Sequence, residues 1–158
     1  MKMKFLWLTG MALVAISAFA ATQFVKATDN IQAGGALVAS WKEVGLTPGA
    51  NVTYTLSALT NFTYGCVSGS KKSPTSPSAP VVTGGLSTKS GTWTARGGGS
   101  ISAILAITPP NPDIILPSCP AGTKPVLAYV SYSGVSLSDG LGGSAPLPDA
   151  WAIYYNLT

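Results

Sequence analysis

The sequence predicts an all-β protein: an antiparallel β-sandwich of the immunoglobulin-like or Greek-key type, with a small closed β-barrel as the alternative. Three observations lead to this prediction. Several segments alternate apolar and polar residues with the period of two that is typical of strands. No segment beyond the N-terminus carries a convincing helical period, and 12 prolines interrupt the chain. The only 2 cysteines can form one disulfide.

The N-terminus indicates export. Two lysines within the first four residues precede an apolar run over residues 5–19, and the run ends in the small-x-small triplet Ala18-Phe19-Ala20. These features are typical of a secretory signal peptide, and the run is short for a membrane-spanning helix. We therefore expect residues 1–20 to be removed, with cleavage after Ala27 as the second choice. The mature protein is expected to be secreted, without a membrane span.

Length and composition limit the domain organisation and the kinds of partner expected for the mature chain. Residues 21–34 show no pattern and are predicted to be a flexible N-terminal arm, whereas residues 35–158 are long enough for a single β-sandwich domain. The small excess of basic over acidic residues lacks the dense positive patch of a nucleic-acid-binding protein. Charged residues make up only 9% of the chain, which leaves self-association or adhesion to a surface open.

The cysteines are interpreted through this expected export. Cys66 and Cys119 are the only two, and the chain has no histidine and no C-x-x-C motif. A zinc site needs about four ligands, whereas two thiols in an oxidising compartment normally pair. We predict a structural Cys66–Cys119 disulfide, which contributes about 4 kcal/mol of stability in the simple loop-entropy model.

The clearest strand signal covers residues 51–66. Even positions from Val52 to Cys66 are mostly apolar, and odd positions are mostly polar. This alternation predicts either one long strand or two strands joined by a bend near Thr60. The even face is the predicted core face, so Cys66 is expected to point inward.

Weaker signals extend the pattern in both directions. Residues 35–45 alternate with Trp41 on the apolar face, and residues 150–158 predict a closing strand with Trp151 on its apolar face. Residues 90–108 predict a hairpin with Trp93 on the apolar face of its first strand.

A further strand is predicted over residues 125–140. The apolar phase flips at Gly134, as at a β-bulge.

Six segments of the chain form a set of short motifs: Ser40–Leu46, Asn51–Ala58, Tyr64–Cys66, Pro109-Pro110, Cys119–Gly122 and Val126–Asp139. This set resembles the pattern of a group of small exported proteins of actinobacteria and related bacteria. The resemblance covers about two thirds of the chain and implies export, an all-β fold and the Cys66–Cys119 bond. It implies no activity, because none is attached to the group.

Catalytic chemistry finds little support. Triads that use histidine are excluded, because the chain has none. An S-x-x-K motif over residues 68–71 is similar to that of penicillin-binding enzymes, but it lies in a predicted loop and its companion motifs come in the wrong order. We therefore predict no catalytic residues, no metal ligands and no cofactor.

The acids are expected to be solvated. Most lie in predicted loops or turns, and Glu43 is expected on the exposed side of a strand beside Lys42. The alternatives are a pair of acids in a cleft for glycoside cleavage, or a calcium site at Asp113 or Asp139. The acidic residues are Asp29, Glu43, Asp113, Asp139 and Asp149.

Aromatic residues give the only binding hypothesis. Trp41 and Trp93 are expected in the core, whereas Trp151, Tyr154 and Tyr155 cluster near the C-terminus, where adjacent tyrosines must face opposite sides of a strand.

The sequence thus predicts an exported, non-catalytic structural or binding module, whose partner is unknown. A cell-surface polymer and a second copy are the candidate partners. The alternatives are a carbohydrate- or polymer-binding module that uses these three aromatics, and a small histidine-free hydrolase.

Overall fold

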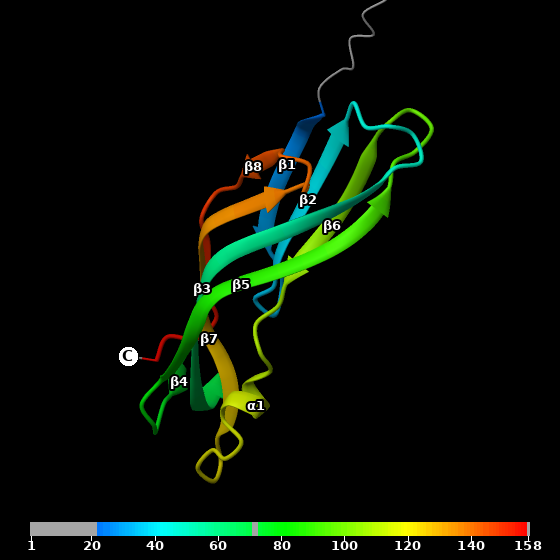
Figure 1. The fold of residues 1–158 in the computed structure, drawn as a ribbon. Coiled ribbons are helices and arrows are strands. Elements are labelled where there is room, and N and C mark those ends of the chain that lie inside the picture. Colours follow the sequence, from blue (N-terminus) through cyan, green and yellow to red (C-terminus); the bar gives the residue numbers. More distant parts are fainter. Residues whose placement is uncertain (1–21, 71–72, 158) are drawn as a thin grey trace, which may run out of the picture.

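A computed structural model of the protein describes residues 22–70 and 73–157. Within them the chain forms nine strands and one single-turn helix (Figure 1). In chain order the elements are β1 (Gln23–Ile31), β2 (Leu37–Val44), β3 (Asn51–Ser70), β4 (Ser73–Thr75), β5 (Val81–Thr94), β6 (Ile101–Ile107), α1 (Pro112–Ile115), β7 (Lys124–Ser138), β8 (Ser144–Pro146) and β9 (Ala150–Ile153). The predicted signal peptide lies outside the described residues, apart from the alternative cleavage site at Ala27.

The strands form two antiparallel sheets. The smaller sheet has the order β1-β2-β6. In the larger sheet β3 is central and pairs with β5, β4 and β7, and β7 also pairs with β8 and β9. Figure 1 shows the two sheets as separate layers in the upper half, while β3 and β7 run on to the lower end beside α1. The sheets do not close on each other, so the sandwich prediction is confirmed and the barrel alternative is wrong.

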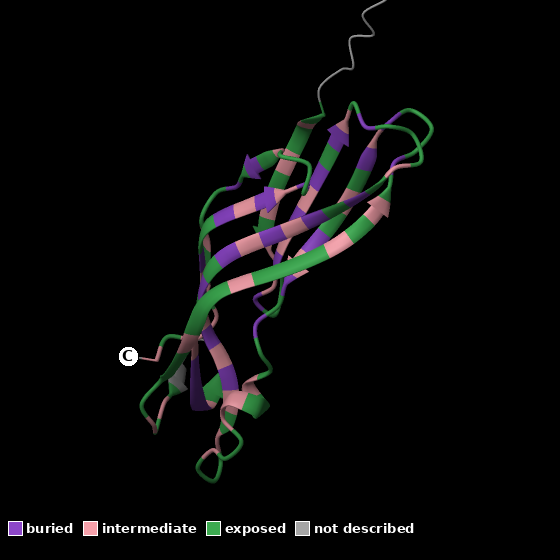
Figure 2. Ribbon diagram, in the orientation of Figure 1, coloured by how far each residue is buried: buried purple, intermediate pink, exposed green. Residues whose placement is uncertain are grey.

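The core lies between the two sheets. Burial alternates along β2, β3 and β7, which is visible as alternating colours along these strands in Figure 2. Even residues of β3 point inward, as the sequence predicts, and Trp41 is buried while Trp93 is half-buried against the core. Across the sandwich, the hydroxyl of Tyr132 donates a 2.6 Å hydrogen bond to the carbonyl of Gly35.

β3 is one continuous strand of 20 residues, which decides between the two predictions for this segment. It stays paired with β5 throughout residues 51–64. Both strands curve (Figure 1), and β5 carries Gly85 opposite Thr60 and Gly84 opposite Asn61. A Cβ atom at Gly84 would collide with the carbonyl oxygen of Thr60, so this close backbone approach requires glycine.

The predicted β-bulge at Gly134 is confirmed. The register between β3 and β7 shifts at this point, because Ser57 faces Ser136 while Leu59 faces Ser133. Gly134 has a φ of 57° and its N–H donates to Oδ1 of Asp149. The bulge explains why the apolar phase of the sequence flips here.

The predicted hairpin over residues 90–108 is wrong. β5 pairs with β3 and β6 pairs with β2, so residues 95–100 cross from one sheet to the other. The crossing is fixed by reciprocal bonds with the β2–β3 loop, including Leu46 N–H to the Gly99 carbonyl. Alternation indicates which face of a strand is buried but not which strand is its neighbour, and this limit accounts for the error.

The predicted flexible arm is also wrong over most of its length. Residues Gln23–Ile31 form β1, which pairs with β2 and packs Phe24, Ala27 and Ile31 against the core. The register shifts between Phe24 and Lys26, and this irregularity interrupts the period of two. The strand was therefore not recognisable from its alternation.

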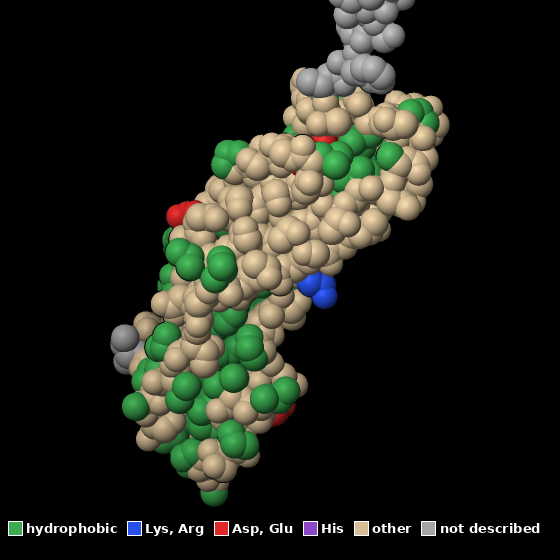
Figure 3. Space-filling model, in the orientation of Figure 1, with side chains coloured by type: hydrophobic (Ala, Val, Ile, Leu, Met, Phe, Trp, Pro, Cys, Tyr) green, Lys and Arg blue, Asp and Glu red, His purple; other side chains and the backbone are tan. Residues whose placement is uncertain are grey.

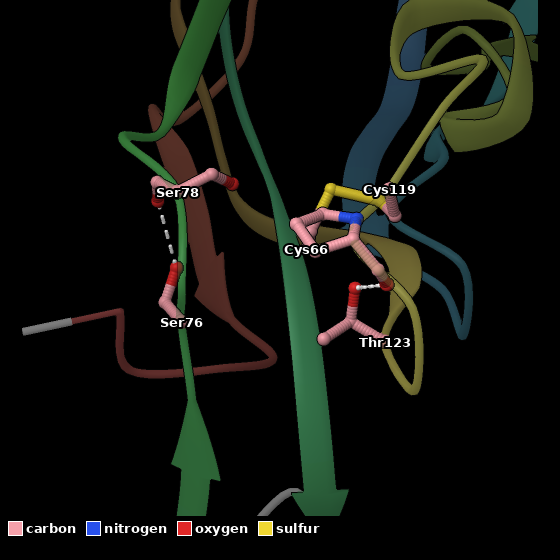
Figure 4. Close-up of a disulfide and its surroundings, with 6 residues drawn as sticks. Cys66, Ser76, Ser78, Cys119 and Thr123 are labelled. Carbon is pink, nitrogen blue, oxygen red and sulfur yellow. Dashed lines mark hydrogen bonds between the residues drawn. A yellow bond between two sulfur atoms is a disulfide. The ribbon is translucent and has the colours of Figure 1, made fainter.

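The Cys66–Cys119 disulfide is formed, with the two Cα atoms 5.6 Å apart. Cys66 is buried on β3, as predicted, and Cys119 lies in the loop between α1 and β7 (Figure 4). The same loop is closed by the hydroxyl of Thr123, which donates to the carbonyl of Pro120 at 2.6 Å. The disulfide thus ties the long β6–β7 connection to the lower end of the larger sheet.

Among the described residues there is no helix of the length and apolarity needed to cross a bilayer.

Candidate functional site

Two acidic side chains meet inside the sandwich. Glu43 on β2 is 0% exposed and Asp139, directly after β7, is 1% exposed. The prediction that both are solvated is therefore wrong. For Glu43 the alternation itself carried the signal, because Glu43 shares its phase with Trp41 on the apolar side of the strand. The charge of Glu43 predicts the exposed side of the strand, whereas its position in the alternation predicts the buried side. The structure has it on the buried side.

Tyr54 and backbone amides hold these carboxyl groups. The Tyr54 hydroxyl donates a 2.6 Å hydrogen bond to Oε2 of Glu43. Oδ1 of Asp139 accepts from the N–H groups of Leu141 at 2.7 Å and Gly143 at 2.8 Å. Oε1 of Glu43 and Oδ2 of Asp139 are buried and accept no hydrogen bond from the described residues. A Cβ atom at Gly143 would collide with Oδ2, so glycine is needed for this close approach.

Burial is the largest influence on the ionisation of Glu43. It raises the pKa of Glu43; the hydrogen bond from Tyr54 lowers this pKa, and the neighbouring Asp139 carboxyl raises it again. Burial and the contact with Glu43 raise the pKa of Tyr54, so its hydroxyl remains a donor. A proton between Oε1 of Glu43 and Oδ2 of Asp139 would give both unpartnered oxygens a bond. Burial and the neighbouring Asp139 carboxyl therefore favour the protonated form of Glu43.

An aromatic cluster forms the apolar wall of this site. Trp41 lies 4.7 Å from Tyr54 and 5.1 Å from Trp93, measured between ring centroids. Phe24 contacts Tyr54 edge-on at 6.2 Å. Such rings exclude water and lower the local dielectric constant, which strengthens the electrostatic effects on the carboxyl groups.

The chemistry open to the carboxyl pair is limited by its burial. Glycoside cleavage needs acids on either side of a bound sugar, and side chains with 0% and 1% exposure do not reach one.

No group of three or more potential metal ligands occurs within the part of the chain that the structure describes. Asp113 is exposed at the start of α1, away from the core, so the structure does not bring together the two residues considered for calcium.

The three predicted binding aromatics are separated. Trp151 on β9 is 67% exposed, together with Ile153 on the same face. Tyr154 and Tyr155 are half-buried instead, and Tyr154 donates to the carbonyl of Gln32 at 3.1 Å. The strand ends at Ile153, and its inward face carries Ala150 and Ala152. The predicted apolar face of this strand, with Trp151 and Ile153, is therefore the exposed one, and the two alanines face the core.

Tyr154 and Tyr155 line a hollow near the β1–β2 turn, which has a volume of about 500 Å³. Prolines of the β6–α1 loop and apolar residues of β7 form the rest of its wall, so it suits an apolar group. Its remaining lining residues are Ala33, Gly34, Thr108, Pro109, Pro110, Asn111, Pro112, Val126 and Leu127.

Trp151 lies on the outer face of the larger sheet. Residues that pair across antiparallel strands share a face, and the register aligns Asn61 of β3, Ser131 of β7 and Trp151 of β9 in one row. The two neighbouring rows of the same face carry further exposed apolar side chains: Leu59 and Leu86 in one row, and Val82 and Ile153 in the other. We call these five residues the outer apolar face: Leu59, Val82, Leu86, Trp151 and Ile153.

The surface of the molecule is poor in charge. Figure 3 shows few Lys, Arg, Asp or Glu side chains on the face in view, and hydrophobic side chains gather over its lower half. Many polar residues on the outer side of the larger sheet are Ser and Thr whose hydroxyl groups bond each other across strands, as Thr53 does with Thr92 at 2.7 Å and Thr55 with Ser90 at 2.8 Å. Uncharged hydroxyl and apolar groups thus dominate this side of the protein.

Comparison with known proteins adds no family: no protein-family model, curated protein or solved structure matches the chain.

Proposed function

We propose that the protein is an exported, non-catalytic binding module whose ligand is a carbohydrate or a similarly hydroxyl-rich polymer. The observation that carries this proposal is the position of Trp151, which stands 67% exposed in a row with Ser131 and Asn61. An exposed indole stacks on the apolar face of a sugar ring, while neighbouring amide and hydroxyl groups bond the sugar hydroxyls.

The surroundings of Trp151 support a polymer over a small molecule. Apolar side chains and hydroxyl groups extend from β9 across β7 and β3 to β5, as the outer apolar face and the polar rows around it. Such a surface contacts several consecutive units of a chain, each weakly, and it lacks the enclosed cavity that a small ligand needs. The low proportion of charged residues in the chain, 9%, suits binding to a neutral polymer.

Export is part of this proposal and has two supports. The disulfide between Cys66 and Cys119 is consistent with folding in an oxidising compartment. The N-terminal sequence has the composition of a signal peptide. A polymer at the cell surface or in the surrounding medium is therefore the ligand to test.

The histidine-free hydrolase is the weaker alternative. Its acids would be Glu43 and Asp139, which lie between the sheets, and not beside Trp151 on the outer face. A module that binds without cleaving needs neither of them to reach solvent.

Retention on insoluble polysaccharides tests the proposal. The mature protein is incubated with cellulose, chitin and peptidoglycan, and the bound fraction is measured. We expect retention on at least one of them and a loss of affinity of about tenfold in Trp151→Ala, since stacking contacts of this kind contribute on the order of 1 kcal/mol or more. Ile104→Ala is the matched control, because Ile104 is similarly exposed but lies on β6 of the other sheet. No retention of the wild type, or equal losses in both variants, contradicts the proposal.

A further inference from the structure

β5 has a long edge without a strand partner. It pairs with β3 in an unbroken register from Val81 to Thr94, and no described strand pairs with its other side. The nearest strand of the smaller sheet, β6, does not cover it, because a hollow of about 350 Å³ lies between Ser87–Lys89 and residues 106–108. Backbone N–H and C=O groups on this side of β5 therefore remain available for another strand.

The other outer strands carry devices that discourage edge pairing. β1 has a register shift and the charged residues Lys26 and Asp29, and β8 and β9 are only 3 and 4 residues long. β6 is half the length of β5. β5 is 14 residues long and contains one charge, Lys89, and no proline. Natural sheets normally protect such an edge with charges, prolines, bulges or a covering segment.

We propose that β5 pairs with β5 of a second copy of this chain, antiparallel about a two-fold axis. An antiparallel edge is complementary to itself under such an axis, because each residue contributes to the ladder in both copies. The side chains favour the same partner. Ser and Thr of β5 already bond hydroxyl groups of β3, and Ser and Thr of a second β5 offer the same groups. Leu86, which is 72% exposed, would be covered.

The charge on β5 restricts the register. Directly opposite residues must lie on the same face, so the axis passes through a residue and not between two residues. An axis at Lys89 would set two lysines opposite each other, which is unfavourable. An axis at Ser87 places Lys89 opposite Gly85 and Leu86 opposite Thr88 of the second copy. We place the centre of the interface at Ser87, because it avoids this repulsion and lies near the middle of β5, so that most of the strand is paired. The two outer apolar faces then belong to one continuous sheet.

Sedimentation velocity over a wide concentration range tests the pairing, in the absence of any polysaccharide. We expect a monomer–dimer equilibrium for the wild type and a dissociation constant at least about tenfold higher for Leu86→Lys, because an edge lysine opposes pairing. Ile104→Lys is the matched control, since Ile104 is 64% exposed on the free edge strand of the other sheet. A wild type that stays monomeric at millimolar concentration overturns the proposal. A dimer lost only in Ile104→Lys overturns it too, because the interface then lies on β6.

Cysteine cross-linking locates the interface independently of affinity. Thr88→Cys places an exposed thiol on β5 near the proposed axis, and Ser102→Cys places one on β6. The native Cys66–Cys119 bond stays intact in both variants. The axis at Ser87 sets the two Thr88 positions diagonally across the interface, beyond the reach of a direct disulfide but within that of a short bismaleimide. We expect covalent dimers of Thr88→Cys with this reagent and none of Ser102→Cys, with circular dichroism confirming that both variants fold. Equal cross-linking of the two variants contradicts the assignment to β5. Because no polymer is present, these outcomes are separate from the test of Trp151.

Discussion

The hydroxyl of Tyr54 donates a 2.6 Å hydrogen bond to Oε2 of Glu43, and this bond joins the two sheets of the sandwich. Tyr54 belongs to β3 and Glu43 to β2, while Asp139 approaches from the end of β7. The hydrogen-bond donors to the two carboxyl groups are neutral: one phenol and two backbone N–H groups. Among the described residues no cationic side chain donates to Glu43, and the neighbouring Asp139 carboxyl further raises its pKa, so three elements depend on the protonation state of Glu43.

The stability of the protein should therefore fall as pH rises. The pKa of Glu43 is raised in the folded state, first by burial. A raised carboxyl pKa contributes stability that is complete below the unfolded value of about 4.3 and is lost as pH rises through the folded value. Thermal unfolding between about pH 4 and about pH 8 measures this, and we expect the midpoint to fall by several degrees across this range.

Glu43→Gln should remove most of this dependence. The amide keeps an oxygen for Tyr54 and adds an N–H donor toward Asp139, so we expect a gain of about 1 kcal/mol at pH 8 and little change at pH 4. Asp113→Asn alters an exposed acid and should keep the wild-type profile. Parallel profiles of the wild type and Glu43→Gln would contradict the raised pKa of Glu43.

Tyr54→Phe should destabilise the protein and move its pH profile. Loss of the hydroxyl leaves Oε2 of Glu43 buried without its donor, which costs about 2 kcal/mol. The hydrogen bond from Tyr54 lowers the pKa of Glu43, so its removal should shift the fall in stability to higher pH. Urea unfolding at several pH values measures both effects. A uniform loss at every pH would mean that the Tyr54 hydroxyl does not affect the ionisation of Glu43.

The disulfide should contribute about 4 kcal/mol to the free energy of unfolding, because Cys66 and Cys119 close a loop of 53 residues. The double variant Cys66→Ala/Cys119→Ala removes the bond without leaving a free thiol. We expect its urea midpoint to be well below that of the oxidised wild type and insensitive to dithiothreitol, whereas the wild type should lose stability on reduction. If reduction leaves the wild type unchanged, the bond has no stabilising role.

Sequence alone predicted those features that depend on local alternation. The inward face of β3, the burial of Trp41, the bulge at Gly134 and the disulfide between Cys66 and Cys119 all follow from the phase of apolar residues or from the count of thiols. Each of these features is fixed by a few neighbouring residues, or by the lack of any other partner.

The errors arose where partners come from distant parts of the chain. Alternation does not show that β5 chooses β3 and β6 chooses β2, since both strands have a suitable face for either neighbour. It also gives no distance between Glu43 and Asp139, which lie on different elements and meet only when the sheets pack. The alternation in β9 also does not show which of its two faces packs on the core: Ala150 and Ala152 do, and Trp151 is exposed.

The bend of the larger sheet should depend on Gly84. A Cβ atom at this position would collide with the carbonyl oxygen of Thr60, a backbone atom that cannot move without disturbing β3. The φ angle of Gly84 is not in the left-handed region, so the collision is the only cost of adding a methyl group. We expect Gly84→Ala to lower the free energy of unfolding by about 2 kcal/mol, as for other overpacked sites. Gly98→Ala is the control, because a Cβ atom there meets nothing within 4 Å. Urea unfolding of the two variants measures the difference, and equal stability would show that β3 and β5 can separate at the bend without cost.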